Sequence, residues 1–94
     1  MNTHAEPDES LLPKVHGRFR LQWEQAQQSW VLLYPEGMVK LNQSAGEIMK
    51  RCDGARSVPQ IIADLEHTFE VEDLGGDVRE FLQIATRQHW LEWL

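Results

Sequence analysis

The sequence predicts an α+β domain of winged-helix-like arrangement, in which a three-stranded antiparallel sheet precedes three helices. Two observations indicate this class. Polar and apolar residues alternate over the first part of the chain, as in strands, and apolar residues recur at helical spacing after residue 42. The chain has 94 residues, which is enough for one domain. Because a three-stranded sheet is unstable with an uncovered apolar face, we expect the helices to pack against it.

Three strands are expected, at residues 14–23, 29–34 and 38–41. The first alternates between basic and apolar side chains, which is typical of a half-buried strand. The second is apolar on both faces and is therefore expected at the centre of the sheet. Pro35 suits the second position of a tight turn, and Gly37 is expected to close that turn with a positive φ. The third strand would then return antiparallel, with one neighbour and a free outer edge.

The first helix is expected to begin at Asn42 or Ser44, and Ser44 with Glu47 has the spacing of a capping box. Gly54 is expected just after its C-terminus. Apolar residues at positions i, i+3, i+4 and i+7 predict a buried stripe formed by Ala45, Ile48, Met49 and Cys52.

Two further helices follow. The second is expected to start after Ser57, which can cap it, and its stripe comprises Val58, Ile61, Ile62, Leu65 and Phe69. The third is expected to run from near Asp77 to near His89, with a stripe of Val78, Phe81, Leu82 and Ala85. The final segment, HWLEWL, is compatible with a last helical turn or with a short extended tail.

Residues 1–13 are polar and contain two prolines, so they are predicted to form a mobile tail before a single domain at residues 14–94. The formal charge of −6 disfavours nucleic acid as a partner, because binding to phosphates needs Lys and Arg. The sequence shows neither a signal-peptide pattern nor an apolar run near the roughly 20 residues of a membrane span, so no membrane partner is expected. The single cysteine, Cys52, is consistent with a reducing compartment, and we expect a cytoplasmic location.

The sequence offers no pattern of a catalytic or metal site. Cys52 lies on the buried stripe of the first helix, where cysteine acts as a small apolar residue rather than as a nucleophile. The four histidines lack the spacing of zinc ligands, and Gly75-Gly76 is an isolated pair rather than a phosphate-binding loop. The acidic residues at 70–77 lack the ligand spacing of a calcium loop. We therefore expect no enzyme activity, no metal and no cofactor.

The segment LLYPEGMVKLNQSAGEIMKRCDGARSVPQIIADL, followed by DVREFLQIA, resembles the PqqD family of peptide chaperones in pyrroloquinoline quinone (PQQ) biosynthesis. The resemblance rests on Pro35-Glu36 after a strand, on Leu41-Asn42 before a helix, on the run CDG at 52–54, and on the Asp-Val…Phe-Leu start of the last helix. It extends from about residue 13 to residue 91. The chain departs from the family where Gln88 and His89 stand, since a glycine often follows the last helix in the family.

The resemblance implies a non-catalytic peptide chaperone, also called a RiPP recognition element, that binds the precursor peptide PqqA. The chaperone would present PqqA to PqqE, a radical S-adenosylmethionine enzyme. In the family, the leader segment of the precursor adds as a strand beside the third strand and packs against the third helix. The peptide-binding residues implied for this chain are Met38, Val39, Lys40 and Leu41 on the strand edge and Asp77, Arg79, Leu82, Gln83 and Thr86 on the last helix.

Three alternatives remain open on the sequence alone. Leu82 is equally compatible with the core, where Val78 and Phe81 are also expected. The same topology suits a winged-helix regulator that binds nucleic acid, although no Lys or Arg lies between Ser57 and Phe69, where a basic recognition helix would need them. A free strand edge can also pair with its own copy, so a homodimer is possible.

Overall fold

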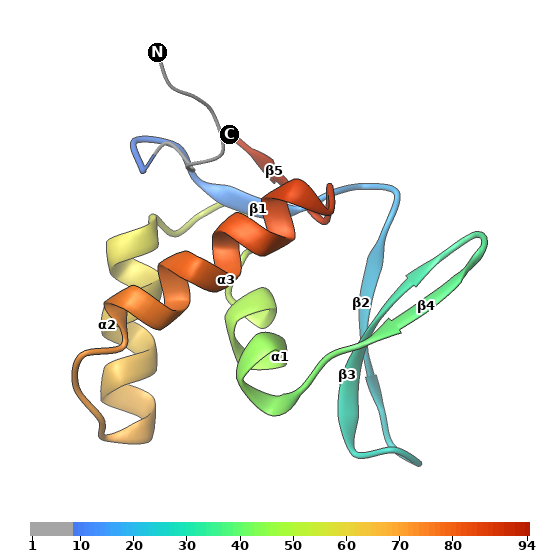
Figure 1. Cartoon of the computed structure of the whole chain (residues 1–94), viewed down its shortest axis with the longest axis horizontal. Coiled ribbons are helices and arrows are strands. Elements are labelled where there is room, and N and C mark those ends of the chain that lie inside the picture. The colour runs from blue at the N-terminus through green and yellow to red at the C-terminus, as the bar shows by residue number, and fades with distance from the viewer. Residues whose placement is uncertain (1–8) are drawn as a thin grey trace.

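The computed structural model describes residues 9–94 and consists of a helical body from which a three-stranded sheet extends (Figure 1). The elements in chain order are β1 (Pro13–Val15), β2 (Arg20–Glu24), β3 (Ser29–Tyr34), β4 (Gly37–Lys40), α1 (Gln43–Lys50), α2 (Val58–Phe69), α3 (Gly75–Arg87) and β5 (Leu91–Trp93). The strands form two antiparallel sheets, β2-β3-β4 and β1-β5. The predicted α+β class, with a three-stranded antiparallel sheet followed by three helices, is confirmed.

The first predicted strand is divided in two. A turn in which the N–H of Phe19 donates to the C=O of His16 (2.9 Å) separates β1 from β2. β1 then pairs with β5 rather than with β3, so HWLEWL contains a short strand. The ordered pairing with β5 begins before residue 14, where the domain was predicted to start. Pro13 pairs with Trp93, and Leu12 and Leu94 exchange two backbone hydrogen bonds of 2.8 Å. The part of the predicted mobile tail at residues 1–8 lies outside the described residues.

The β2-β3-β4 sheet has β3 at its centre, as its two apolar faces predicted. Leu32 lies on the face turned toward the helices and Val31 on the opposite face, and both are fully buried. The turn between β3 and β4 differs from the prediction. Gly54 is the glycine with a positive φ in the described part of the chain, so Gly37 closes the hairpin without one.

The helix starts follow the local capping chemistry. Asn42, rather than Ser44, caps α1, because its side chain accepts a hydrogen bond from the N–H of Ala45 (2.8 Å). The predicted box between Ser44 and Glu47 does not form. α2 begins with a complete capping box between Ser57 and Gln60. α3 starts at Gly75, slightly earlier than predicted, and has no side-chain cap.

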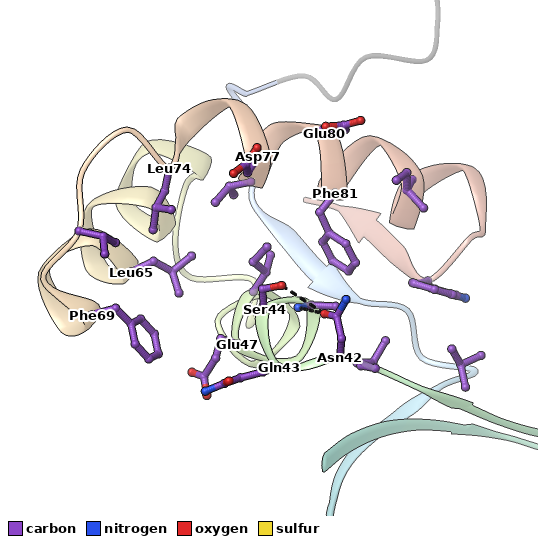
Figure 2. Close-up of a pocket in the computed structure, with 18 of the residues that line it drawn as sticks. Asn42, Gln43, Ser44, Glu47, Leu65, Phe69, Leu74, Asp77, Glu80 and Phe81 are labelled. Atoms are coloured by element: carbon purple, nitrogen blue, oxygen red, sulfur yellow. Dashed lines mark hydrogen bonds between the residues drawn. The ribbon is translucent and has the colours of Figure 1, made fainter. Parts of the chain in front are cut away.

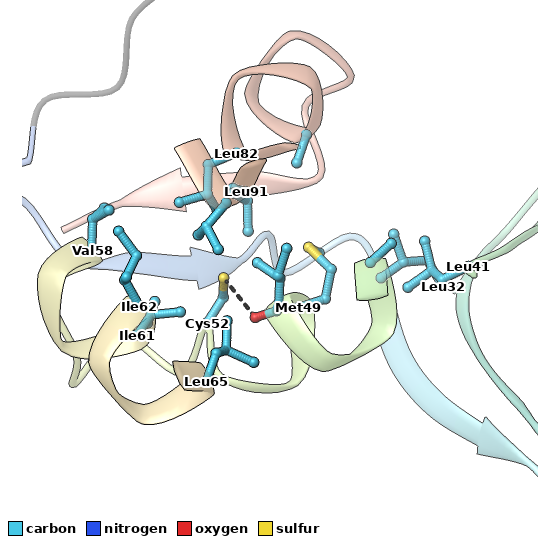
Figure 3. Packing of buried hydrophobic residues seen from close by; sticks show 14 residues of the cluster. Leu32, Leu41, Met49, Cys52, Val58, Ile61, Ile62, Leu65, Leu82 and Leu91 are labelled. Carbon is cyan, nitrogen blue, oxygen red and sulfur yellow. Dashed lines mark hydrogen bonds between the residues drawn. The ribbon is translucent and has the colours of Figure 1, made fainter. Parts of the chain in front are cut away.

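The core lies between the three helices, the β1-β5 sheet and the inner face of β3 (Figure 3). The stripe predicted for α1 is buried, including Cys52, whose thiol donates to the C=O of Ile48 (3.4 Å). Burial raises the pKa of Cys52 to about 12, so the thiol stays protonated at neutral pH. Phe69 departs from the predicted stripe, since it is 42% exposed at the last position of α2.

A buried cation connects α1 to α2. Arg51 is only 7% exposed, and its guanidinium donates to the Glu47 carboxylate (2.8 Å), to the Glu47 carbonyl (2.9 Å) and to the Asp64 carboxylate. The ring of Phe69 lies 6.0 Å from its Cζ atom. These partners satisfy a charge that would otherwise be costly to bury, and they fix the C-terminal end of α1 beside α2.

We expect Gly46→Ala to destabilise the protein by about 1–3 kcal/mol, because α1 packs closely on β3 there. A Cβ atom at residue 46 would lie 2.7 Å from Cδ1 of Trp30. Gly76→Ala is the matched control, since a Cβ atom there meets no atom within 4 Å. It should stabilise α3 by roughly 0.5–1 kcal/mol through helix propensity. Urea unfolding measures both, and a Gly46→Ala variant as stable as the parent would contradict the close packing.

Asp64 should make folding stability depend on pH in acid. The hydrogen bond from Arg51 lowers the pKa of the Asp64 carboxyl, so the carboxylate form favours the folded state. This contribution is complete above the unfolded-state pKa of about 4 and is lost as the pH falls through the lower folded-state value. The urea midpoint of the parent should therefore fall more steeply below about pH 4 than that of Asp64→Asn. Parallel pH profiles would rule out the linkage.

Candidate functional site

A groove opens between the start of α1, the end of β4 and one face of α3, with the end of α2 at one side (Figure 2). Its volume is about 1010 Å³. The lining residues are Val39, Lys40, Leu41, Asn42, Gln43, Ser44, Ala45, Glu47, Ile48, Leu65, Phe69, Val71, Leu74, Asp77, Val78, Glu80, Phe81, Ile84 and Trp90. The groove thus joins segments that are far apart in the sequence but converge on one core.

The floor of the groove is apolar and partly open to solvent. Phe69, Val71 and Ile84 each expose more than 40% of their surface, and all three line the groove. Phe81 points into it from α3 and lies near Trp90, with ring centroids 6.4 Å apart (Figure 2). Scattered apolar residues on a surface need no explanation, but a contiguous set in a concavity is typical of a binding site.

The two sides of the groove rim differ in whether their acidic residues are paired. On the α1 side, Glu47 is paired with Arg51 (2.8 Å). On the α3 side, Asp77 and Glu80 both line the groove, and neither has a hydrogen-bond or ion-pair partner within residues 9–94. Figure 2 shows these two carboxylates along α3, across the groove from Glu47. The α3 rim is therefore acidic and unneutralised.

The outer edge of β4 borders the groove and pairs with no other strand of residues 9–94. The N–H of Leu41 donates to the C=O of Trp30 (3.0 Å), so these residues form a hydrogen-bonded pair. Because such pairs alternate along an antiparallel ladder, Val39 also directs its backbone groups toward β3, whereas Met38 and Lys40 direct theirs away. The free edge therefore offers the N–H and C=O groups of Met38 and Lys40.

The structure brings part of the predicted site to the groove. Val39, Lys40 and Leu41 line it, as does Asp77. Met38 does not line the groove, since its side chain lies on the opposite sheet face from Val39 and is 49% exposed. The predicted edge strand at residues 38–41 thus corresponds closely to β4 (Gly37–Lys40).

Four of the predicted α3 residues do not line the groove. Leu82 is fully buried and belongs to the core. Arg79 pairs with Glu9 (2.6 Å). Thr86 accepts a hydrogen bond from the indole N–H of Trp93 (3.2 Å), and Gln83 shares that side of the helix. The groove is instead lined by the adjacent face, which carries Asp77, Glu80, Phe81 and Ile84.

Several groove residues were missed by sequence reasoning. Phe69 and Phe81 were assigned to the core, and Val71, Ile84 and Trp90 were not assigned. A signal was available for α3, since Asp77, Phe81 and Ile84 stand at i, i+4 and i+7 and so share one helix face. Nothing in the sequence pattern shows that this face opposes α1 and β4.

Two further observations concern metal binding and membrane spans. Within residues 9–94, no group of three or more His, Cys, Asp or Glu side chains is placed to hold a metal ion. In the same part of the chain, the helices are too short or too polar to cross a membrane.

The model of one protein family, described as Coenzyme PQQ synthesis protein D (PqqD), matches residues 29–91. This match includes β3, β4 and all three helices. The chain belongs to the PqqD family. The family expected from the sequence is thereby confirmed, and its matched region contains every residue that lines the groove.

Relatives within the PqqD family are similar along nearly their whole length. A "PqqA binding protein" of Pseudomonas aeruginosa is 49% identical over 87 residues, which cover 92% of this chain and 95% of the relative. A protein of the same name from Pseudomonas syringae is 42% identical over 90 residues, covering 95% and 92%. Both names state binding of PqqA, which is the partner expected from the family resemblance.

Solved PqqD structures share the fold. A solution structure of the PqqD truncation of Methylobacterium extorquens PqqCD has a TM-score of 0.75 at 26% identity, covering 90% of this chain and 93% of that one. That protein is described as a functional and stand-alone RiPP recognition element. The crystal structure of PqqD from Xanthomonas campestris has a TM-score of 0.56 at 31% identity, covering 83% and 89%.

Proposed function

We propose that this chain is a peptide chaperone of PQQ biosynthesis that binds the precursor peptide PqqA by strand addition at β4 and presents it to PqqE. The observation that carries the proposal is the free edge of β4 beside an apolar groove, in a chain 49% identical to proteins named for PqqA binding. Strand addition is a general mode of peptide recognition in which backbone hydrogen bonds supply much of the affinity.

The geometry of β4 supports a two-part contact with an added strand. The backbone groups of Met38 and Lys40 face outward and can bond to a peptide backbone in register. Side chains of the peptide would alternate between the two faces of the extended sheet. Those on the face of Val39 would enter the groove and pack against Phe81 and Ile84 of α3.

Presentation to an enzyme fits a module whose binding surface is confined to one side. The Methylobacterium extorquens structure is a truncation of PqqCD, so in that protein the recognition element is part of a larger chain. The enzyme expected from the family resemblance is PqqE, and the faces of the chain away from the groove remain available for it. In this arrangement the groove side binds PqqA, and a different face of the chain binds PqqE.

Lys40→Pro should weaken PqqA binding by about two- to tenfold, because proline removes an N–H that faces the free edge. Lys40→Ala is the matched control, since it keeps the backbone donor and should lose less. The β3-β4 ladder does not use this N–H, so both variants should fold, which thermal unfolding checks. Isothermal titration calorimetry with synthetic PqqA gives the affinities. Equal losses in the two variants would refute a backbone-led mechanism.

Ile84→Ser should lower the affinity for PqqA by about tenfold, because it removes about 1–2 kcal/mol of apolar burial from the groove floor. Ile84 is 43% exposed in the free protein, so its replacement should change stability little. Leu94→Ser is the control, since Leu94 is 55% exposed and does not line the groove. The same titration measures both variants. An unchanged affinity for Ile84→Ser would exclude this groove as the peptide site.

A further inference from the structure

We infer that the peptide segment in the groove carries a Lys or Arg side chain that lies against Asp77 and Glu80 on the α3 rim, beside apolar side chains packed on the floor. This inference rests on the proposed peptide-binding function and adds the chemistry of the occupant. It follows from the combination of an apolar groove, a free strand edge and an unneutralised acidic rim.

The acidic rim differs from the other carboxylates near the groove in having no partner. Glu47 on the opposite wall is neutralised by Arg51 (2.8 Å), and Glu9 outside the groove is paired with Arg79 (2.6 Å). Asp77 and Glu80 have no such cation among the described residues. They stand three positions apart on one face of α3, where two like charges repel each other mildly.

Three cations on the elements around the groove do not neutralise this pair. Arg79 is on α3 itself but is held by Glu9, and Arg51 is buried between Glu47 and Asp64. Lys40 lines the groove from the β4 side, but its side chain lies on the sheet face opposite to that of Val39, and it forms no ion pair with Asp77 or Glu80 within residues 9–94. The α3 rim is therefore complementary to a cation that comes from outside the chain.

A contribution to helix stability explains the position of Asp77 but not that of Glu80. Asp77 lies in the first turn of α3, where the positive end of the helix dipole favours an acid. Glu80 lies beyond that turn, and the dipole effect falls off within it. A basic side chain that bridges both carboxylates accounts for the pair, and an acidic peptide side chain would be repelled from the same place.

The test compares Asp77→Asn/Glu80→Gln with Glu72→Gln/Asp73→Asn. The control pair makes the same change of charge at exposed residues that do not line the groove. The probes are synthetic PqqA and PqqA peptides in which each Lys or Arg is changed in turn to Gln. Calorimetric titrations are made at low and at high NaCl concentration.

We expect the Asp77→Asn/Glu80→Gln variant to lose about three- to tenfold in affinity for PqqA at low salt, and the control pair to lose little. High salt should reduce the affinity of the parent by a similar factor and that of the variant much less. One Lys or Arg replacement in PqqA should weaken binding to the parent and have no further effect on the variant, which shows that the two groups interact.

Two results would overturn this inference. If the Asp77→Asn/Glu80→Gln variant binds PqqA as tightly as the parent, while Lys40→Pro and Ile84→Ser weaken binding, the proposed function stands and the cationic contact is wrong. If no Lys or Arg replacement in PqqA is coupled to the α3 rim, the contact is likewise wrong. Absence of PqqA binding to the parent chain would reject the proposed function and this inference together.

Discussion

The register between β3 and β4 is the constraint on which the binding edge depends. Tyr34 pairs with Gly37 across a two-residue loop, and this short connection fixes every pair that follows along the ladder. In this register Val39 packs toward the core, while the backbone groups of Met38 and Lys40 face outward. A slip by one residue would turn Val39 to the other face and exchange the bonded and free backbone groups. The loop at Pro35 therefore determines which hydrogen bonds the edge can offer.

The groove stays open because its walls are anchored separately to the same core. α1 buries Met49, and α3 buries Leu82 and Ala85, so each helix is held by one face and directs another toward the groove. Arg51 adds a polar connection between α1 and α2 that fixes the wall near Phe69. Closing the groove would cover its exposed apolar residues but would break these contacts, which explains why the free protein keeps a partly exposed apolar floor.

The sequence predicted the sheet and the buried stripes because both depend on local periodicity. It did not predict the pairing of β1 with β5, since the partners lie at opposite ends of the chain and each strand has only three residues. Of the α3 residues that it predicted for the site, only Asp77 lines the groove. Periodicity locates the centre of the buried stripe at Val78 and Leu82, but the flank that faces the groove is set by the position of α1 and β4. Phe69 was misplaced for a related reason, since the chain turns at Glu70 with a positive φ directly after it.

The two parts of the proposed contact divide affinity from selectivity. Backbone hydrogen bonds at Met38 and Lys40 are available to almost any extended peptide, so they cannot distinguish one precursor from another. An apolar floor distinguishes by size and shape, and it accepts many hydrophobic sequences with small differences in energy. The acidic pair on α3 has no partner within the described residues, and in the proposed contact it would discriminate by the sign of charge, because carboxylates attract a cation and repel an anion. In the proposed complex, selection of a particular peptide would therefore depend more on the α3 rim than on the strand edge, and the edge would determine where the peptide lies.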